Sequence, residues 1–388
     1  MQGTEKILVF CSREICYCSG NFFAHRLADA FEQLGFDTEV CEFTREDDFD
    51  AVLTPLFGKP YRAIFDFNSL LPRMAAEDGT PVPDLLDGPF YDYILDHPLF
   101  HYNCLVSGAK NFHAIVLDEG QAAYVRRFHP NVKTVHMLPL GAVEAVSGGR
   151  KGAAHGVLFS GTYDSPDKVY EIVKASPEPI QSMIKSIIDQ RLSEPNLPME
   201  EAFSRYLERE GLSIPDSQFA LMMNAMYPAD AYIRDYFRTA ALDALLRRGI
   251  PVTAVGTGWE KYHPCRSDCF AREKGVSFEL SFERIAREQV LLDVSPIFNR
   301  GIHDRILAGM ANRAAVLTDE NPCRSARLSA RRDVMFYSLK DLTTLADAAE
   351  ELLTDSALLE RIQEHAYETF RANHTWMSRA KEILSWRA

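Results

Sequence analysis

The sequence has no run of about 18 or more apolar residues, and this absence excludes a membrane-spanning helix. Its opening segment, MQGTEKILVF, lacks the basic region, long apolar core and small-residue cleavage site of a signal peptide, so we expect a cytoplasmic protein. Basic residues are also few, with 42 Lys and Arg against 55 Asp and Glu. The resulting net charge of −13 repels nucleic acid and anionic lipid at long range, and we expect neither as a partner.

Several catalytic and metal-binding motifs are missing as well. The chain contains no Gly-x-Ser-x-Gly elbow, Walker loop, kinase signature set or His-Glu-x-x-His pair, which disfavours the corresponding hydrolases, nucleotidases, kinases and metalloproteases. Of its eight cysteines, neither Cys16 with Cys18 nor Cys265 with Cys269 has the spacing of a zinc ribbon or finger. We therefore expect buried thiols, no disulfides and no metal.

Short apolar strands alternate with amphipathic helices through most of the chain. Regular alternation predicts a parallel sheet with helices on both faces, and 388 residues are too many for one hydrophobic core. The fold class is therefore α/β, with two Rossmann-like doubly wound domains. The expected strands are 7–11, 38–43, 63–67, 91–95, 114–117, 134–138, 157–160, 252–255, 276–278, 290–294, 315–318 and 334–337.

Composition suggests the domain boundaries. Residues 142–154 are small and glycine-rich and are typical of a linker between a first domain, 1–145, and a second, 155–371. Residues 166–248 are nearly all helical in pattern, which is too long for one crossover, so we expect a helical insertion at about 177–227. A terminal helix occupies 372–388. A basic run near the end of the second domain, interpreted as a solvated surface, comprises Arg324, Arg327, Arg331 and Arg332.

The segment from Leu291 to Asp319 predicts a strand, a polar loop, a helix and a second strand. A loop that leaves the carboxyl end of a parallel strand faces the ligand crevice, and the helix start behind it offers N–H groups to an anion. His303 and Arg305 add donors in the first turn of this helix, expected from His303 to Asn312. The loop suits a phosphate or diphosphate; the alternative is an ordinary turn of an α/β unit.

Glycines follow another expected strand. Gly256 and Gly258 permit a tight turn and a close approach of the backbone to a ligand. Lys261 stands where a dinucleotide fingerprint would need a third glycine, so that reading is disfavoured. Trp259 either stacks on a base or anchors the edge of the domain by packing.

The first half carries candidates for proton transfer and for acceptor binding. Asp96 and His97 end a strand, where an adjacent carboxylate orients a histidine for general base catalysis; alternatively, Asp96 caps the next helix. Ser19, Gly20 and Asn21 form either a polar loop over an acceptor or a helix cap.

Arg234 and Arg238 lie one turn apart on an expected helix and share a face. The pair suits either a diphosphate or a surface ion pair.

The second half resembles GT-B glycosyltransferases, and is closest to the bacterial group described as glycosyl transferase family 1-like or CgeB-like. The resemblance covers about 155–388; the first half is matched only through its DHP and MLPLG stretches. The matching motifs are Gly161-Thr162-Tyr163, Tyr232-Ile233-Arg234, Gly256-Thr257-Gly258-Trp259, His303-Asp304-Arg305 before Leu317-Thr318-Asp319, and the terminal HTWMSRAKEIL.

This resemblance implies that the second domain binds a nucleotide sugar, that the first holds the acceptor, and that transfer occurs in the crevice between them without a metal or cofactor. It also implies that the terminal helix packs back on the first domain. The donor would be UDP- or GDP-linked, and the acceptor a protein, a glycan or a small molecule. The residues implied at the donor are Gly161, Arg234, Gly256, Gly258, Trp259, Asn299, Gly301, His303, Asp304 and Arg305.

The chain departs from this family at one point. Many retaining relatives place two glutamates eight positions apart, where Arg300 and Ala308 stand here. Asp304 is our candidate for the missing carboxylate near the sugar. If the reaction inverts, His97 or Asp96 is the candidate base. A sugar-nucleotide epimerase or phosphorylase, or a two-lobed binding protein without catalysis, remains an alternative.

Overall fold

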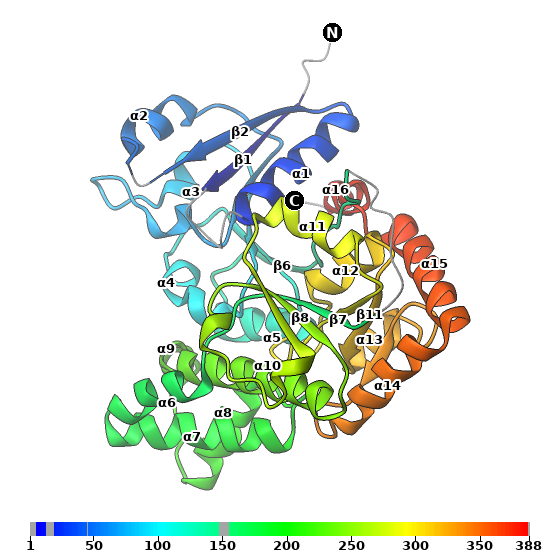
Figure 1. Cartoon of the computed structure of the whole chain (residues 1–388). Coiled ribbons are helices and arrows are strands. Elements are labelled where there is room, and N and C mark those ends of the chain that lie inside the picture. The colour runs from blue at the N-terminus through cyan, green and yellow to red at the C-terminus, as the bar shows by residue number, and fades with distance from the viewer. Residues whose placement is uncertain (1–4, 13–18, 45, 147–154, 387–388) are drawn as a thin grey trace. The chain divides into compact units, whose positions relative to one another are not determined.

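The computed structural model describes residues 5–12, 19–44, 46–146 and 155–386 (Figure 1). Residues 147–154 of the expected linker lie outside the described residues, as do Cys16 and Cys18. The chain forms two compact units, which we describe separately. Unit 1 comprises Met1–Gly141, Pro215–Asn224 and Thr375–Ala388; unit 2 comprises Ala142–Ile214 and Ala225–His374.

Unit 1 is built on a six-stranded parallel sheet in the order β2-β1-β3-β4-β5-β6. Three of its four inner strands, β3, β4 and β5, are buried along their whole length, as expected of an α/β sheet covered by helices. The strands are β1 (Lys6–Ser12), β2 (Asp37–Phe43), β3 (Ala63–Phe67), β4 (Phe90–Ile94), β5 (Phe112–Val116) and β6 (Thr134–Met137).

Helix α1 (Ser19–Gln33) packs against β1 and β2 and against the terminal helix α16 (Trp376–Ser385), as Figure 1 shows. It ends before Gly35, whose φ of 91° gives the left-handed backbone typical of a helix end. The other helices of unit 1 are α2 (Phe49–Leu53), α3 (Val82–Leu85), α4 (Tyr102–Leu105), α5 (Glu119–Phe128) and most of α9 (Asp216–Ala225), with 3₁₀ turns η2 (Thr54–Leu56), η3 (Leu71–Arg73) and η4 (Pro98–His101).

Unit 2 contains a second parallel sheet of six strands, in the order β12-β11-β10-β7-β8-β9. The strands are β7 (Val157–Ser160), β8 (Val252–Gly256), β9 (Phe270–Lys274), β10 (Val290–Leu292), β11 (Ala315–Asp319) and β12 (Met335–Tyr337). Its helices are α6 (Pro166–Ala175), α7 (Glu178–Ser193), α8 (Met199–Arg209), α10 (Tyr227–Arg247), α11 (Phe278–Ala286), α12 (Asp304–Ala311), α13 (Pro322–Arg327), α14 (Thr343–Thr354) and α15 (Ser356–Asn373), with 3₁₀ turns η5 (Trp259–Lys261) and η6 (Ser267–Cys269).

The predicted α/β class with two Rossmann-like sheets is confirmed. The expected strand at 276–278 is wrong: β9 lies earlier, at 270–274, and Phe278 begins α11. Ser277 caps that helix by accepting the N–H of Leu280 at 3.4 Å. Strand β9 is an exposed edge strand with charged side chains, so it shows no apolar pattern in the sequence. Residues 177–227, expected as an insertion, contain α7, α8 and α9.

Helix α12 is held in the core of unit 2 by Ile306, Leu307 and Met310, which pack with Val316 of β11 and Phe370 of α15. This packing fixes where the first turn of α12 meets the carboxyl edge of the sheet. Among the described helices, none is both long and apolar enough to cross a lipid bilayer.

Candidate functional site

Asp293, which follows strand β10, is the centre of the polar network at the carboxyl edge of the unit 2 sheet. Its carboxylate is fully buried and accepts hydrogen bonds from the hydroxyls of Ser295 (2.6 Å) and Thr318 (3.1 Å) and from Nη1 of Arg305 (2.8 Å). Asp293 was not among the predicted site residues, although a carboxylate directly after a buried apolar strand is a signal that could have indicated it.

His303 is the N-cap of α12, and its Nδ1 lies 3.1 Å from carboxylate oxygens of both Asp293 and Asp304. The same nitrogen lies 3.3 Å from the backbone N of Arg305 and can accept that N–H only when Nδ1 is unprotonated. Two carboxylates at the shorter distance favour the tautomer in which Nδ1 carries the proton. Burial acts to raise the pKa of Asp293, but His303, Arg305 and Arg324 outweigh it and hold this pKa well below its usual range.

Arg305 is fixed at both ends of its guanidinium. Nε donates to the carbonyl of Ser160 at the end of β7 (2.8 Å), while Nη1 donates to Asp293. The group lies 5.2 Å from the ring centroid of Phe159, and its Nη2 would be 3.3 Å from a Cβ at Gly161. Arg305 is thus oriented before any ligand arrives, with Gly161 leaving space beside it.

A second arginine reaches the same strand end from α10. Nη1 of Arg238 lies 3.4 Å from the carbonyl of Thr162, and its guanidinium is 5.9 Å from the Phe159 ring. Burial, followed by the positive charges of Arg234 and Arg305, lowers the pKa of Arg238 to about 9. We call Arg234, Arg238 and Arg305 the cationic cluster.

Asp293 pairs with Arg305 at 2.8 Å, but the acids beside the other two arginines of the cluster lie farther away. Asp235 lies 3.9 Å from Arg238 and 3.7 Å from Arg234, and Arg234 is also 3.9 Å from Asp230. Burial raises the pKa of Asp235 to about 6 despite these arginines. Arg234 and Arg238 lie on one helix face as predicted, with ion-pair distances longer than a hydrogen bond.

The glycines after β8 serve a close approach between two backbones. A Cβ on Gly256 would lie 2.1 Å from the carbonyl oxygen of Gly161, and one on Gly258 would lie 2.1 Å from that of Tyr163. Gly161 N and Tyr163 N donate to the carbonyls of Val255 and Thr257, both at 2.9 Å. The close approach predicted for a ligand is therefore made by the loop after β7.

Trp259 is 2% exposed, and its indole N–H donates to the carbonyl of Gly161 at 2.8 Å. Its ring packs among Phe159, Tyr163 and Tyr262. The ring is too deeply buried to stack on a base. The structure therefore favours the alternative interpretation, in which Trp259 anchors the edge of the domain by packing.

Asn299 and Gly301 lie in the loop between β10 and α12 and face protein groups. Asn299 Nδ2 donates to the carbonyls of Pro195 (3.2 Å) and Pro296 (3.0 Å). The carbonyl of Gly301 accepts from Asn321 Nδ2 and from Arg324 Nε, both at 3.1 Å. Both residues thus shape the loop from within.

Arg324 is fully buried, so its interpretation as part of a solvated surface is wrong. Its guanidinium pairs with Asp319 at 2.7 Å and donates to the Ser295 hydroxyl at 2.7 Å and to the Gly301 carbonyl. Arg324 therefore stabilises the polar loop between β10 and α12 from the protein interior. The spacing of arginines in a basic run could not predict this burial.

A pocket of about 700 Å³ lies beside the loops that follow β11 and β12. Arg300 and Lys340 line it together with Glu194, Glu201 and Glu320. Because charges of both signs line it, this pocket has no excess of positive charge.

In unit 1, the carboxyl ends of β3 and β4 are joined by Asn68. Its amide Nδ2 donates to Asp96 at 3.0 Å, its Oδ1 accepts from Leu95 N at 3.1 Å, and its backbone N donates to Tyr93 O at 2.9 Å. Asn68 has a left-handed backbone, with φ of 62°. No pattern in the sequence indicates this orientation of Asp96.

His97, rather than Asp96, caps the following turn. Nδ1 of His97 accepts the N–H of Leu99 at 3.1 Å, and the residue is 5% exposed. With Nδ1 occupied, a neutral His97 carries its proton on Nε2 and has no nitrogen available to accept another. Of the two candidate bases, the geometry favours Asp96.

Ser19, Gly20 and Asn21 form the first turn of α1 instead of a loop before it. Oδ1 of Asn21 accepts from the thiol of Cys11 at 3.2 Å, and Nδ2 lies 3.5 Å from Glu42 Oε1. Asn21 therefore belongs to a cluster of polar side chains, with Cys11 and Glu42, that was not predicted from the sequence.

Residues 237–385 match a family model described as glycosyl transferase-like. Among solved structures, sucrose-phosphate synthase from Thermosynechococcus elongatus has 11% identity and a TM-score of 0.57, over 98% of this chain and 97% of its own. Phage T4 BGT in complex with its UDP-glucose substrate has 12% identity and a TM-score of 0.54, over 98% of both chains. AviGT4, a glycosyltransferase of avilamycin A biosynthesis, has 10% identity and a TM-score of 0.52, over 98% and 96%.

No curated protein matches the chain in sequence. The structural matches confirm the expected GT-B fold, and the family model supports glycosyl transfer for the segment that it covers. Neither separates the CgeB-like group from other glycosyltransferases.

Proposed function

We propose that this protein is a glycosyltransferase that moves a sugar from a nucleoside-diphosphate sugar to an acceptor still to be identified. The observation that carries the proposal is the convergence of Arg238 and Arg305 on Phe159, at the carboxyl end of β7. Positive groups that are largely buried together repel each other, and a diphosphate relieves that repulsion. The first turn of α12 adds backbone N–H groups and the positive end of its dipole.

The same groups account for catalysis of bond cleavage. Negative charge develops on the departing nucleoside diphosphate, and donors already held in place stabilise it without reorganisation. Arg305 meets this requirement because Ser160 and Asp293 fix its guanidinium. In this scheme the arginines take the part that a metal ion has in other transferases, so we propose metal-independent transfer.

Two carboxylates complete the proposed chemistry. Asp304, 29% exposed and next to His303, is our candidate for stabilising the oxocarbenium-like sugar. Asp96, oriented by Asn68, is our candidate base for an inverting reaction. We also propose that Ser19, Gly20 and Asn21 contact the acceptor.

The test measures donor binding first and turnover second. Isothermal titration with UDP, GDP, ADP, CMP and dTDP identifies the nucleotide, with UDP first because phage T4 BGT was solved with UDP-glucose. Release of the free nucleoside diphosphate from the matching sugar donor then reports transfer. We expect Arg238→Ala and Arg305→Ala each to weaken nucleotide binding at least about tenfold, since each removes a charge-assisted hydrogen-bond donor.

The control is Arg248→Ala, which removes an exposed arginine paired with Asp347 and Glu350. It should leave binding unchanged. Unaltered nucleotide affinity in the Arg238→Ala and Arg305→Ala variants would overturn the donor-site assignment.

A further inference from the structure

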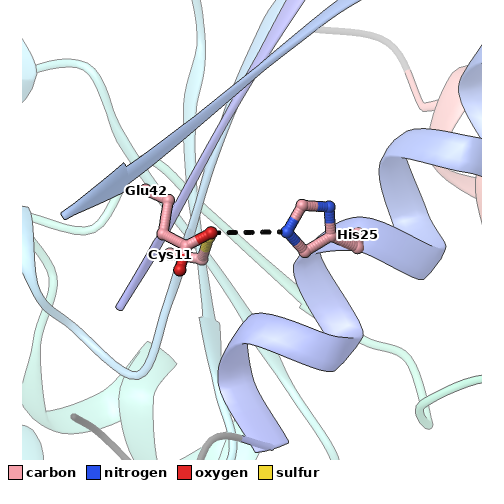
Figure 2. A group of neighbouring side chains, drawn as sticks. All are labelled: Cys11, His25 and Glu42. Carbon is pink, nitrogen blue, oxygen red and sulfur yellow. Dashed lines mark ion pairs between the residues drawn. The ribbon is translucent and has the colours of Figure 1, made fainter. Parts of the chain in front are cut away.

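Three side chains of different chemistry gather on one face of the unit 1 sheet: the thiol of Cys11, the imidazole of His25 and the carboxylate of Glu42 (Figure 2). Their ligand atoms all lie within 4.8 Å of one another. We propose that these residues bind a zinc ion. The inference is independent of the donor site, because all three residues belong to unit 1.

The fold itself brings the three residues together. Cys11 and Glu42 are direct partners in the parallel register of β1 and β2, so their side chains leave the sheet on the same face. Helix α1 packs against both strands and carries His25. Cys11 and Glu42 each stand one residue before the end of their strand, at the carboxyl edge where open α/β sheets meet ligands.

The distances fit shared coordination better than a direct ion pair. Nε2 of His25 lies 3.7 Å from Oε2 of Glu42, beyond the usual 2.7–3.2 Å range of an N–H···O hydrogen bond. Two ligands at about 2.1 Å from a tetrahedral zinc ion stand roughly 3.4 Å apart, and a thiolate at about 2.3 Å stands slightly farther from them. Side-chain adjustments of a few tenths of an ångström up to about 1 Å therefore close the site without moving the backbone.

The donor set selects the metal. Thiolate and imidazole are ligands of zinc and other borderline or soft ions, whereas Mg²⁺ and Ca²⁺ take oxygen ligands. Three protein ligands leave the fourth tetrahedral position to water or to an added ligand. Access is available from solvent, because the His25 side chain is 43% exposed and that of Glu42 is 24% exposed.

Asn21 supplies the support that metal ligands usually receive. Its Oδ1 accepts the Cys11 S–H, and its Nδ2 lies within reach of Glu42 Oε1. Zinc binding replaces the S–H bond by an S–Zn bond and releases that proton to the buffer. The contact of Asn21 Nδ2 with Glu42 does not involve that proton and therefore remains.

The competing explanation is a buried thiol beside a half-exposed ion pair, which requires no metal. The two explanations differ in what the untagged full-length protein does with added Zn²⁺ after treatment with a chelator. The proposal requires one equivalent of Zn²⁺ to bind, measured by competition with a zinc indicator dye. It also requires proton release, measured by titration calorimetry in two buffers of different ionisation enthalpy.

Substitution with Co²⁺ identifies the ligands. A thiolate-to-cobalt charge-transfer band in the near ultraviolet shows sulfur coordination, and intense visible bands show four ligands instead of six. We expect Cys11→Ser to abolish the charge-transfer band. His25→Ala and Glu42→Gln should each weaken Zn²⁺ binding at least about tenfold.

Two matched variants serve as controls. Cys41→Ser removes the neighbouring thiol of β2, and His365→Ala removes a histidine that pairs with Glu368 at 3.3 Å without a nearby cysteine in the described contacts. Both should bind Zn²⁺ as the parent does. Absence of stoichiometric binding, or binding that survives Cys11→Ser with its charge-transfer band intact, would overturn the proposal. Far-ultraviolet circular dichroism and thermal unfolding of each ligand-free variant verify that it folds.

Discussion

Nη1 of Arg305 lies 2.8 Å from Oδ1 of Asp293, a carboxylate with no solvent exposure. The same oxygen is 3.1 Å from Nδ1 of His303. One buried negative charge therefore orients two of the groups proposed to meet the donor diphosphate. The effect of Asp293 on donor binding is indirect, because its buried carboxylate orients Arg305 and His303 and is itself inaccessible to a ligand.

We expect Asp293→Asn to unfold more easily than the parent, by about 3 kcal/mol, because removing one partner of a buried ion pair leaves the other uncompensated. Nucleotide affinity should fall with it. Urea denaturation and titration calorimetry measure the two effects. Asp164→Asn is the control, since Asp164 is 42% exposed and pairs only with Lys168 among the ion pairs of the described chain. Equal stability of Asp293→Asn and parent would contradict this reading.

Arg238→Met should separate stability from binding. The substitution removes a charge that burial and neighbouring arginines disfavour, so the ligand-free variant should be as stable as the parent or more stable by roughly 1 kcal/mol. Nucleotide binding should nevertheless weaken at least about tenfold. Thermal unfolding with and without nucleotide measures both quantities. A variant that loses stability while keeping its affinity would show that Arg238 serves the fold alone.

Asn68 is expected to position Asp96. In Asn68→Asp the side chain still accepts the Leu95 N–H but no longer donates to Asp96, so the Asp96 carboxylate loses the hydrogen bond that orients it. We predict a fall in kcat of between about tenfold and a hundredfold, with little change in the KM of the donor. Asn68→Gly, which keeps the left-handed backbone but lacks the amide, should behave alike. An unchanged kcat in both variants rules out this positioning role.

Asp92 predicts a pH dependence of stability. Burial, opposed by hydrogen bonds from Ser69, raises the pKa of Asp92 to about 6. Between about pH 4 and pH 6 the folded protein keeps a proton that the unfolded chain releases, so the contribution of Asp92 to stability is present at low pH and is lost as the pH rises. The loss is about 3 kcal/mol.

Asp92→Asn cannot release this proton. The difference in unfolding free energy between variant and parent should therefore grow in favour of the variant from about pH 4 to pH 7, as urea denaturation at intermediate pH values measures. Parallel curves would argue against a proton on Asp92.

Gly256→Ala should be costly for two reasons: its φ of 152° disfavours a side chain, and the new Cβ would meet the carbonyl oxygen of Gly161 at 2.1 Å. We expect a loss of at least about 3 kcal/mol in unfolding free energy. Gly35→Ala measures the cost of the backbone conformation alone, because Gly35 has a φ of 91° but no atom lies within 4 Å of the position that a Cβ would take. We expect this substitution to lower the free energy of unfolding by about 1 kcal/mol. If the two alanines cost the same, the loops after β7 and β8 can separate.

The fold was largely predictable because most of its inner strands are buried and therefore apolar. The bounds of β3 and β7 follow directly from the apolar runs at 63–67 and 157–160. Strand β9 was missed because an exposed edge strand carries charges in place of that pattern. Local sequence thus predicts a strand when burial requires apolar residues. It fails for an exposed edge strand, because contact with solvent imposes no such requirement.

The site was predictable only where it depends on contacts between residues that are adjacent in the sequence. The start of α12 was placed near His303 because a capping residue and the helix it begins are adjacent. The contact of Asn68 with Asp96 depends on a left-handed backbone and on strand order, and neither leaves a mark in the sequence. Arg324 was misread because its burial depends on carbonyls of a distant loop.

Unit 1 is assembled from three separate stretches of chain. Trp376 at the start of α16 packs on Phe23 of α1, with ring centroids 5.8 Å apart, and lies so close to Gly141 that a Cβ there would approach its ring to 2.8 Å. During synthesis on the ribosome, β1 to β6 therefore emerge long before the helix that covers part of their core. A truncated product ending at residue 141 would leave apolar surface uncovered and would be prone to aggregate.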